Sequence, residues 1–363
     1  MYSLHTHDTF FFRGNGEFTS GENSFTSGLF PPNPQTLYGA LRGNWIEQYG
    51  TVEAFISGAY REKVGTPDSH GALQLNGVYL SLDDYLYVPL PQHTQVLKSD
   101  TGILTAHPLK LVKGSNRESD DAGSRLIGVS RKKSTSPDGK WIKAVDWKTL
   151  MIKKEPVDVL TVTDFIEEQP KIGIYVDNDS GTAKDGMLYQ YSRNVLKETA
   201  ALVIDAHLPD PLDLLTMGNK GTLWSMEKEP ELREQLNFVY DAQAILPDVE
   251  QSKMIAVTLL TPALVTSELI DEQTKVFNYT KTNWIQSAIP RPVHTGGWDI
   301  VKKRPKPRYT MLKPGTTFII TTPDESIEDF LDEINSTLFS DEGQEEGYGR
   351  VIISPIQFEE ERV

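Results

Sequence analysis

The segment TTFIITTPDESIEDFLDEINSTLFSDEGQEEGYGRVIIS, residues 316–354, has the clearest secondary-structure pattern in the chain. Its apolar runs predict strands at Thr316–Thr321 and Arg350–Ser354, because short runs of β-branched residues between turn residues favour strands. Thr322-Pro323-Asp324-Glu325 has the spacing of a capping box, which predicts a helix start. The predicted helix Ser326–Leu338 has one apolar face, made by Ile327, Phe330, Leu331, Ile334 and Leu338. Strand, helix and strand at this distance predict a β-α-β crossover whose helix covers one face of a small sheet.

The N-terminal end of the chain shows a second unit of this kind. Apolar and polar residues alternate over residues 2–13, which is the period of a half-buried strand. Asn33 and Pro34 are an N-cap residue and a first-turn proline, so they predict a helix start. The apolar residues that follow at a spacing of four are Leu37, Leu41, Trp45 and Tyr49. This spacing predicts a helix of about four turns, and one such unit at each end predicts an α+β protein of two sandwiches in tandem.

The middle of the chain contains further strand patterns and one long irregular segment. Val78–Leu90 has a strand pattern, and Lys171–Val176 with Met187–Tyr191 is a candidate hairpin. Residues 98–150 are polar, basic and rich in turn residues, so we expect a loop-rich insertion that becomes ordered on binding. Two more strands are predicted at Ala201–His207 and Lys253–Thr261.

Length and composition define the class of protein. At 363 residues and 40.7 kDa the chain exceeds one ordinary core, and we predict two domains, 1–165 and 166–363. Apolar residues make up 38% and charged residues 24%, which is a globular composition. The sequence has no cysteine and no apolar run of 18 residues, and its first residues lack the pattern of a signal peptide. We therefore expect a cytoplasmic protein without a membrane segment.

The charge of the chain is strongly segregated. The net charge is −15, yet Lys98–Lys154 holds thirteen Lys or Arg against six Asp or Glu, a net of +7. Lys281–Lys313 holds eight against one, again +7, whereas Asp324–Glu361 holds thirteen acids against one arginine, a net of −12. Blocks of one sign are typical either of solvated faces or of a protein that grips a polyanion on one face and a basic partner on another.

Two histidines near the N-terminus are candidate metal ligands. His5 and His7 share one face of the predicted strand, a spacing that some metal sites use. The other five histidines form no second spaced pair, so satisfied or exposed strand histidines are the simpler interpretation. Asp177–Gly181 is better interpreted as a β-turn than as a calcium loop, and the Gly-rich segments lack the P-loop and dinucleotide patterns. We predict no metal, no other cofactor and no catalytic residue.

Basic residues interleaved with aromatic ones are candidates for binding nucleic acid. In Trp298–Tyr309 the cations would hold phosphates and the rings would stack on bases. The alternative is a basic surface loop whose rings pack inward. Residues 125–133, which include Arg131 and Lys132, are a weaker case of the same pattern. On the predicted first helix Gln35 and Arg42 lie two turns apart, so they either face one ligand together or form plain helix surface.

Two N-terminal segments carry a family resemblance. Asp8–Phe18, DTFFFRGNGEF, and Phe30–Arg42, FPPNPQTLYGALR, closely resemble the start of the third subunit of type III-B CRISPR (Cmr) effector complexes, a family of the RAMP superfamily. Later segments agree in order, namely the hairpin 172–191 with GMLY, GGWD at 296–299, KPGTTF at 313–318 and GYGR at 347–350.

This resemblance implies a fold and a role. The implied fold is two tandem ferredoxin-like (RRM-like, βαββαβ) domains, the first carrying the insertion near 98–150. The implied role is that of a non-catalytic subunit that holds the repeat-derived 5′ tag of the crRNA and meets target RNA indirectly. The implied protein partners are the large polymerase-like subunit and the neighbouring RAMP backbone subunit. The candidate RNA-binding residues are Arg13, Gln35, Thr36, Arg42, Trp298, Lys302, Arg304, Tyr348 and Arg350, to which the basic segment adds Arg131 and Lys132.

Two features depart from the family pattern, and two other functions stay open. Family members often carry a Gly-Gly segment with arginines after the hairpin, whereas Met217–Gly221 contains no arginine. The acidic segment beyond Asp324 is heavier than expected, and we expect it to contact protein rather than RNA. The alternatives are a crRNA-processing RAMP endoribonuclease, with His5 or His7 as general acid or base, and a metal-dependent hydrolase that uses both histidines.

Overall fold

The computed structural model describes most of the chain. The described residues are 1–14, 25–26, 28–113, 123–176, 182–218, 221–265, 282–299, 301–324 and 326–359. The chain forms two compact units, each made from three separate segments. Unit 1 consists of Met1–Asp84, Val162–Glu229 and Asp299–Arg304. Unit 2 consists of Tyr85–Thr161, Pro230–Trp298 and Pro305–Val363.

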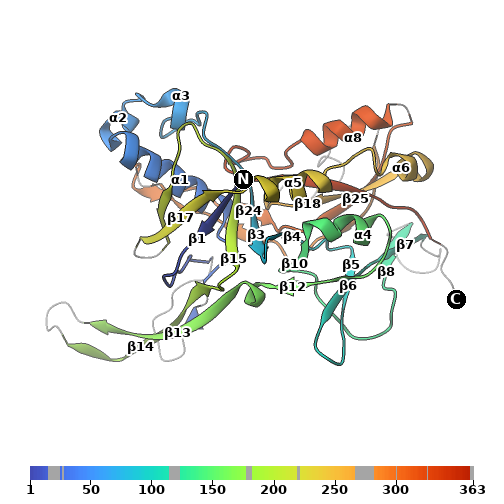
Figure 1. The fold of residues 1–363 in the computed structure, drawn as a ribbon, viewed down its shortest axis with the longest axis horizontal. Helices are drawn as coiled ribbons and strands as arrows, with labels where there is room; N and C mark the ends of the chain where they lie inside the picture. The colour runs from blue at the N-terminus through green and yellow to red at the C-terminus, as the bar shows by residue number, and fades with distance from the viewer. Residues whose placement is uncertain are drawn as a thin grey trace. The chain divides into compact units, whose positions relative to one another are not determined.

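Both units mix helices and strands (Figure 1), so the predicted α+β class is confirmed. The elements of unit 1 are β1 (Tyr2–His5), β2 (Phe25–Thr26), α1 (Pro34–Tyr49), α2 (Val52–Ile56), α3 (Arg61–Val64), β3 (Gln74–Leu82), a 3-10 turn (Val162–Asp164), β13 (Ile166–Val176), β14 (Ala183–Leu196), β15 (Ala200–His207), β16 (Leu214–Met217) and β17 (Thr222–Lys228).

The elements of unit 2 begin with β4 (Tyr85–Pro89), β5 (Thr94–Lys98), β6 (Leu104–Pro108), β7 (Lys110–Lys113), β8 (Ser124–Ile127), β9 (Ser134–Thr135), β10 (Lys140–Lys143), a 3-10 turn (Ala144–Asp146), α4 (Trp147–Met151), β11 (Val157–Asp158) and β12 (Leu160–Thr161). They continue with α5 (Pro230–Val239), α6 (Leu246–Ser252), β18 (Met254–Leu259), β19 (Ala263–Val265), β20 (Trp284–Ala288), β21 (Val293–Thr295), β24 (Tyr309–Leu312), β25 (Thr317–Thr321), α8 (Ile327–Ser336) and β26 (Val351–Pro355). The short strands β22 (Trp298–Asp299) and β23 (Arg304–Pro305) each contain a boundary between the units.

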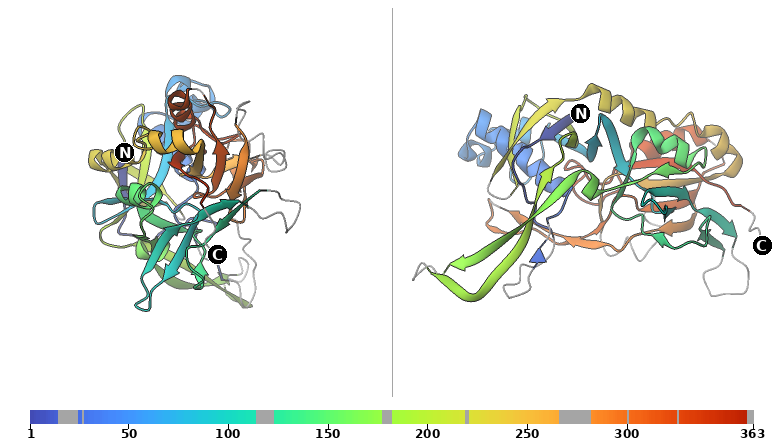
Figure 2. Two further views of the ribbon diagram at one scale, coloured as in Figure 1. Left: turned by 90° about the vertical axis from the view of Figure 1, so that its right-hand side faces the viewer. Right: turned by 60° about the horizontal axis from the view of Figure 1, so that its bottom comes forward.

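The strands of unit 1 pair in the order β3-β15-β1-β17-β16, and every pair is antiparallel. When β1, β3, β15 and β17 are numbered in chain order and the sheet is read from β17, the spatial order is fourth, first, third, second. The helix α1 contacts β3 and β16 and lies against these strands (Figure 2). Leu37, Leu41 and Trp45 on α1 are buried, as the spacing of four predicts.

A side chain of α1 forms hydrogen bonds with the free edge of strand β16. The amide oxygen of Asn44 accepts a hydrogen bond from the Thr216 N–H (2.9 Å), and its Nδ2 donates to the Thr216 carbonyl (3.1 Å). The same Nδ2 also donates to the carbonyl of Ala40 (2.8 Å). A carboxamide carries one acceptor and two donors, so Asn44 satisfies both backbone groups of Thr216 as a neighbouring strand would.

A long hairpin extends from unit 1. β13 and β14 pair antiparallel from Ile166↔Leu196 to Val176↔Ala183, and the short strand β2 pairs parallel to β14. Both figures of the whole fold show this hairpin reaching out from the other strands of the unit (Figures 1 and 2). The predicted hairpin is therefore confirmed, and its strands are longer than the sequence pattern indicated; the turn residues 177–181 lie outside the described residues.

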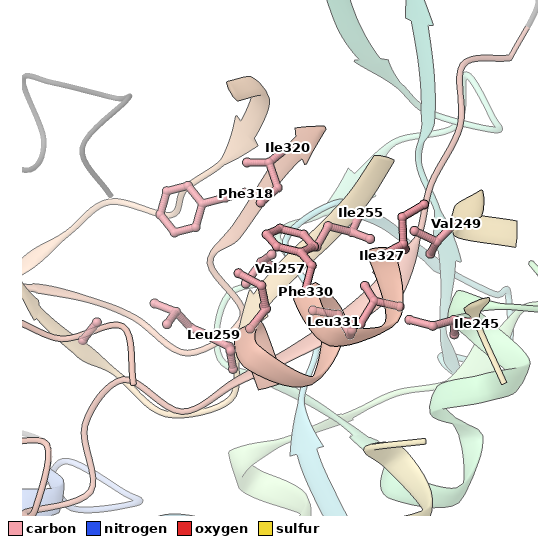
Figure 3. Packing of buried hydrophobic residues seen from close by; sticks show 14 of the residues in the cluster. Ile245, Val249, Ile255, Val257, Leu259, Phe318, Ile320, Ile327, Phe330 and Leu331 are labelled. Atoms are coloured by element: carbon pink, nitrogen blue, oxygen red, sulfur yellow. The ribbon is translucent and has the colours of Figure 1, made fainter. Parts of the chain in front are cut away.

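Unit 2 contains a sheet with the same connectivity as unit 1. Its strands lie in the order β20-β25-β18-β26, all antiparallel, which is again fourth, first, third, second when read from β26. Ile327, Phe330, Leu331 and Ile334 on α8 pack against Ile255, Val257 and Ile353 of this sheet (Figure 3). The C-terminal strand, helix and strand thus form as predicted, and they bury one apolar face.

Three details of the fold differ from the sequence interpretation. Val78–Leu90 is interrupted because Asp83 and Asp84 both adopt positive φ, 50° and 64°, and turn the chain between β3 and β4. The segment 98–150 is not an irregular loop: it forms β6 to β10 and α4, although 114–122 lie outside the described residues. Helix α8 begins at Ile327 without a side-chain cap, and Glu325 of the predicted capping box lies outside the described residues.

The compact units do not coincide with the predicted sequence halves. Residue 165 lies close to the crossing between Thr161 and Val162, but both units draw on early and late parts of the chain. The reason is strand pairing: β15 pairs with β1 and β3, which precede it by more than a hundred residues, so unit 1 needs strands from two distant segments. No helix within the described residues is long and apolar enough to cross a membrane.

Candidate nucleic-acid interface

Arg13 follows a buried aromatic cluster in unit 1. Phe10 and Phe12 are buried, with ring centroids 4.9 Å and 6.1 Å from that of the buried Trp224, and Phe30 lies 5.3 Å from Phe10. Main-chain hydrogen bonds also tie Phe10 to Asn194 in both directions, at 2.8 Å each. Arg13 is the first exposed residue after this cluster. A rigid buried segment therefore sets the position from which the exposed guanidinium extends.

The glycine-rich segment that departs from the family pattern lies beside this cluster. Gly218 has φ of +84°, a conformation that glycine adopts at no steric cost. A Cβ built there would lie 3.4 Å from the Phe11 carbonyl oxygen and 3.5 Å from the Phe12 ring. The backbone of residue 218 therefore passes directly next to the residues that precede Arg13. Asn219 and Lys220 lie outside the described residues.

Gln35 and Thr36 lie at the start of α1. Pro34 is the first helical residue, and the Thr36 N–H donates to the Asn33 carbonyl at 2.9 Å. Thr36 is exposed and Gln35 is half-buried. Pro34 has no N–H and the Thr36 N–H is already bonded, so the structure places both side chains at the helix start without showing an anion site there.

Arg42 lies over two aromatic rings. Its guanidinium carbon lies 5.5 Å from the ring centroid of Tyr38, one turn earlier on α1, and 5.4 Å from that of Phe55 on α2. Both rings are buried, whereas Arg42 is half-buried. Cation–π attraction from both rings favours this position of the guanidinium. The structure therefore shows an arginine held over two rings where the sequence offered either a ligand contact or plain helix surface.

The second predicted group, the loop that carries Lys302, contacts residues 66–70 of the same unit. Lys302 forms an ion pair with Asp68, whose side chain is 72% exposed. Two residues further on, the ring of His70 contacts Tyr38 edge to face, with centroids 5.4 Å apart. Segment 66–70 thus touches both the ring that holds Arg42 and the loop that carries Lys302. Residues 260 positions apart in sequence are joined in one region.

Two further residues of the same loop are less fully described. Arg304 is exposed at the start of β23 and belongs to unit 1 with Lys302. Trp298 begins β22, and its side chain lies outside the described part of the structure.

Arg131 and Lys132 lie on an exposed loop of unit 2. The loop joins β8 to β9, and both side chains are exposed. The Lys132 N–H donates to the Ser130 hydroxyl at 3.1 Å, which forms a local turn. The surrounding 123–135 contains no aromatic residue, so the pattern of cations with stacking rings is absent from this loop.

Tyr348 and Arg350 lie just before β26 in unit 2, and their side chains have different surroundings. Tyr348 is fully buried in a cluster with Leu264 and Met311, so its ring packs inside the unit and does not face solvent. The Arg350 backbone is fixed on both sides: its N–H donates to Thr261 Oγ1 (2.9 Å) and its carbonyl accepts from the Leu260 N–H (2.8 Å). The Arg350 side chain is half-buried.

The histidines near the N-terminus do not gather other ligands in the described structure. His5 ends β1 opposite Ser225, and His7 is exposed three residues before the aromatic cluster. Across the described residues no group of three or more His, Asp or Glu is arranged to hold a metal ion.

One buried histidine was not singled out by the sequence. His93 precedes β5 in unit 2, and its Nδ1 lies 3.0 Å from Thr317 Oγ1. Burial, together with the nearby charge of Lys154, lowers the pKa of His93 to about 3. Burial also lowers the pKa of Lys154 to about 8, and its ammonium donates to the carbonyls of Met151 (2.6 Å) and Pro355 (3.1 Å). His93 is therefore a neutral structural residue at physiological pH.

The geometry divides the predicted residues into two groups. Arg13, Gln35, Thr36, Arg42, Lys302 and Arg304 belong to unit 1, and Arg131, Lys132, Trp298, Arg350 and the buried Tyr348 belong to unit 2. Sequence reasoning missed Tyr38, Phe55 and Asp68, which position members of the first group. Only Tyr38 had a signal, since it lies one turn before Arg42; nothing in the sequence pairs Phe55 or Asp68 with its cation.

Comparison with solved structures finds similar chains at low identity. Two cryo-EM structures of the type III-B Cmr-beta bound to cognate target RNA, one of them also with AMPPnP, contain chains that are 15% identical to this one. The alignments cover 92% of this chain and 88% of those chains, with TM-scores of 0.47 and 0.48. A crystal structure of the Csm3-Csm4 subcomplex of the type III-A CRISPR-Cas interference complex gives 13% identity, coverage of 89% and 93%, and a TM-score of 0.38. These values are too low to support a functional conclusion.

A protein-family model gives the decisive match. No curated protein matches the sequence. Residues 2–355, however, match the model of the family described as CRISPR-associated protein (Cas_Cmr3). The match extends far beyond the N-terminal segments that first suggested the resemblance. The chain therefore belongs to the Cas_Cmr3 family, the type III-B CRISPR effector subunits that its sequence resembles.

Proposed function

We propose that this chain is the non-catalytic subunit that holds the repeat-derived 5′ tag of the crRNA in a type III-B effector complex. It has no catalytic role in this proposal. In the complex it bridges the large polymerase-like subunit and the neighbouring RAMP backbone subunit, and it meets target RNA only indirectly.

The observation that carries the proposal is the convergence of Arg42 and Lys302 on residues 66–70. Arg42 is held by Tyr38 and Phe55, and Tyr38 touches His70, while Lys302 pairs with Asp68. An arginine whose position is restricted can recognise a base edge or a phosphate in one geometry, which a flexible surface cation does not do. Arg13 adds further donors in the same unit. This combination suits a short RNA segment of fixed sequence.

The strand orders support the expected fold at a finer level. Both units have four antiparallel strands in the spatial order fourth, first, third, second, which is the order of a ferredoxin-like βαββαβ sheet. We infer tandem ferredoxin-like domains. Unit 1 departs from the ideal pattern, because residues 208–218 between β15 and β17 contain the strand β16 where the pattern has a helix.

The acidic helix α8 supports a separate protein contact. Glu328, Asp329, Asp332 and Glu333 are all exposed on the side of α8 opposite its buried face. Four carboxylates on one helix face repel RNA phosphates and favour a basic surface. We infer that this face binds a partner subunit. Glu328→Gln combined with Asp332→Asn is expected to weaken assembly without changing tag binding, as judged by co-purification and by an RNA-binding assay; the reverse outcome would refute this assignment.

The tag-binding role is tested by RNA affinity. Arg42→Ala is expected to weaken binding of a labelled crRNA that carries the tag by tenfold or more, because a charge-assisted hydrogen bond contributes about 1.5–3 kcal/mol. Arg61→Ala on α3 is the matched control, since Arg61 is an exposed arginine of the same unit. Equal affinity of the Arg42 variant and the wild type would contradict the assignment.

A second experiment identifies the RNA directly. The chain is purified gently from its host with an affinity tag, and the co-purified small RNAs and proteins are identified by sequencing and mass spectrometry. RNAs that share one fixed 5′ segment, together with other RAMP subunits and a large polymerase-like chain, are the expected result. A chain purified without RNA would argue against the role.

A further inference from the structure

A cationic surface on unit 2 is built around the loop that joins β8 to β9. Lys98 ends β5, and β5 pairs antiparallel with β9 through Val96↔Thr135 and Leu97↔Ser134. The next position in this register places Lys133 opposite Lys98. Arg131 and Lys132 precede Lys133, and all four side chains are exposed. Four adjacent positions on neighbouring segments therefore carry positive charge.

This arrangement is unfavourable in the free protein. Like charges opposite one another on paired strands repel, and such pairs cost stability. Among the described acids close in sequence, Asp138 is paired with Lys313 at 2.7 Å, and Asp100 lies exposed in the turn after Lys98. A repulsive cluster that is kept on the surface is typical of a site whose charge is neutralised by a ligand.

The loop is held in place by a buried glutamine. The Gln95 amide oxygen accepts from the Ser130 N–H (3.0 Å), and its Nε2 donates to the Ser130 carbonyl (2.8 Å). Gly128 passes so close that a Cβ there would lie 2.8 Å from the Gln95 amide oxygen. Only 8% of Gln95 is exposed. The buried Gln95 thus fixes the backbone next to Arg131, Lys132 and Lys133, which lowers the entropy cost of binding.

We propose that Lys98, Arg131, Lys132 and Lys133 form a phosphate-binding surface for single-stranded RNA that makes no base contacts. The proposal rests on the proposed RNA-binding function and adds a second contact with a different chemistry. Residues 94–108 and 123–135 contain no Phe, Tyr or Trp. Without rings to stack on bases, the surface senses only the charge of the backbone, so it binds every RNA sequence equally.

The test uses two RNAs of equal length, one with the 5′ tag and one of unrelated sequence. Binding of each is measured by fluorescence anisotropy between 50 and 300 mM salt, conditions in which phosphate contacts are strongly salt-dependent. Lys132→Gln combined with Lys133→Gln is compared with Lys153→Gln combined with Lys228→Gln. The control pair removes two exposed lysines from elsewhere in the chain. Neither pair removes a buried contact, so both variants are expected to fold.

For the Lys132/Lys133 variant we expect the slope of log affinity against log salt to fall in magnitude by about 1.4 for both RNAs, since each single-strand phosphate contact contributes about 0.7. The preference for tagged over unrelated RNA stays unchanged. A loss confined to tagged RNA, or an equal loss in the control pair, would overturn the proposal. Failure of the tag-binding role has a different signature, because the wild type would then show no preference for tagged RNA at any salt concentration. Failure of the wild type to bind either RNA would overturn both.

Discussion

The two compact units hold their cations in different ways. In unit 1, the guanidinium of Arg42 lies over the rings of Tyr38 and Phe55, so packing restricts its position. In unit 2, two hydrogen bonds between Gln95 and Ser130 hold the backbone, while the cationic side chains that follow are exposed to solvent. A guanidinium in a restricted position can select a base, whereas a fixed backbone with free ammonium groups can only collect phosphates. If both proposals hold, one chain combines a selective contact with an unselective one.

The largest effect is expected from the aromatic cluster under Arg13. Trp224→Ala removes a fully buried ring that Phe10 and Phe12 contact, and the cavity is expected to cost about 3–5 kcal/mol of unfolding free energy. Urea denaturation measures this loss. Leu223→Ala, an exposed neighbour on β17, is the control and is expected to change stability by less than about 0.5 kcal/mol. Equal losses in the two variants would show that the cluster does not anchor the unit.

Acid is expected to weaken unit 2 through His93. The folded-state pKa is about 3 and the ordinary value is 6.5, so between these pH values the unfolded chain binds the proton and the folded chain does not. Stability is therefore fully present above pH 6.5 and is lost as the pH falls towards 3, by about 1.4 kcal/mol per pH unit at most. His93→Gln is expected to flatten this dependence in chemical denaturation at several pH values. His294→Gln, at an exposed position, is the control; the same flattening in both variants would exclude His93 as the cause.

The third prediction separates oriented from unoriented charge in unit 1. Phe55→Leu keeps an apolar side chain of similar volume but removes one ring face from Arg42. The expected result is about a twofold to fivefold loss of affinity for tagged RNA, because a cation–π contact contributes about 0.5–1 kcal/mol. Binding of unrelated RNA is expected to stay unchanged. An equal loss for both RNAs would mean that Arg42 acts only as a charge.

The smallest effect is expected at the ion pair between Asp68 and Lys302. Both side chains are partly exposed, and such pairs contribute at most about 1 kcal/mol. Asp68→Asn releases Lys302 from its carboxylate, so we expect tagged RNA to bind up to about threefold more tightly at low salt, with the gain lost at high salt. Isothermal titration at two salt concentrations measures this. Weaker binding would show instead that Asp68 holds the loop 299–304 in its binding position.

Local periodicity predicted the elements that depend on one face being buried. The helix 34–49, the hairpin around 171–191 and the C-terminal strand, helix and strand all formed where apolar spacing placed them. The segment 98–150 was misjudged because its strands are short, polar on their exposed faces and paired with distant partners. Leu97, for example, pairs with Thr105 and with Ser134, and neither pairing leaves a signal in a local window.

The candidate site was predictable only in its charged members. Cations such as Arg13 and Lys302 stand out through the family resemblance and the charge pattern, but the residues that position them do not. Phe55 looks like any core phenylalanine, and Asp68 like any turn acid. Tyr348 shows the opposite error: an aromatic next to glycines in sequence is buried against Leu264 and Met311. Whether a ring faces solvent depends on tertiary packing, which spacing alone does not determine.

The carboxamide of Asn44 affects how readily the protein aggregates at high concentration. An exposed strand edge with Leu214 and Leu223 about half exposed beside it is a template on which a second molecule could extend the sheet. Because both free backbone groups of Thr216 are already bonded to Asn44, an incoming strand finds no partner at that position. Asn44 is therefore expected to disfavour aggregation of the free chain through this strand edge.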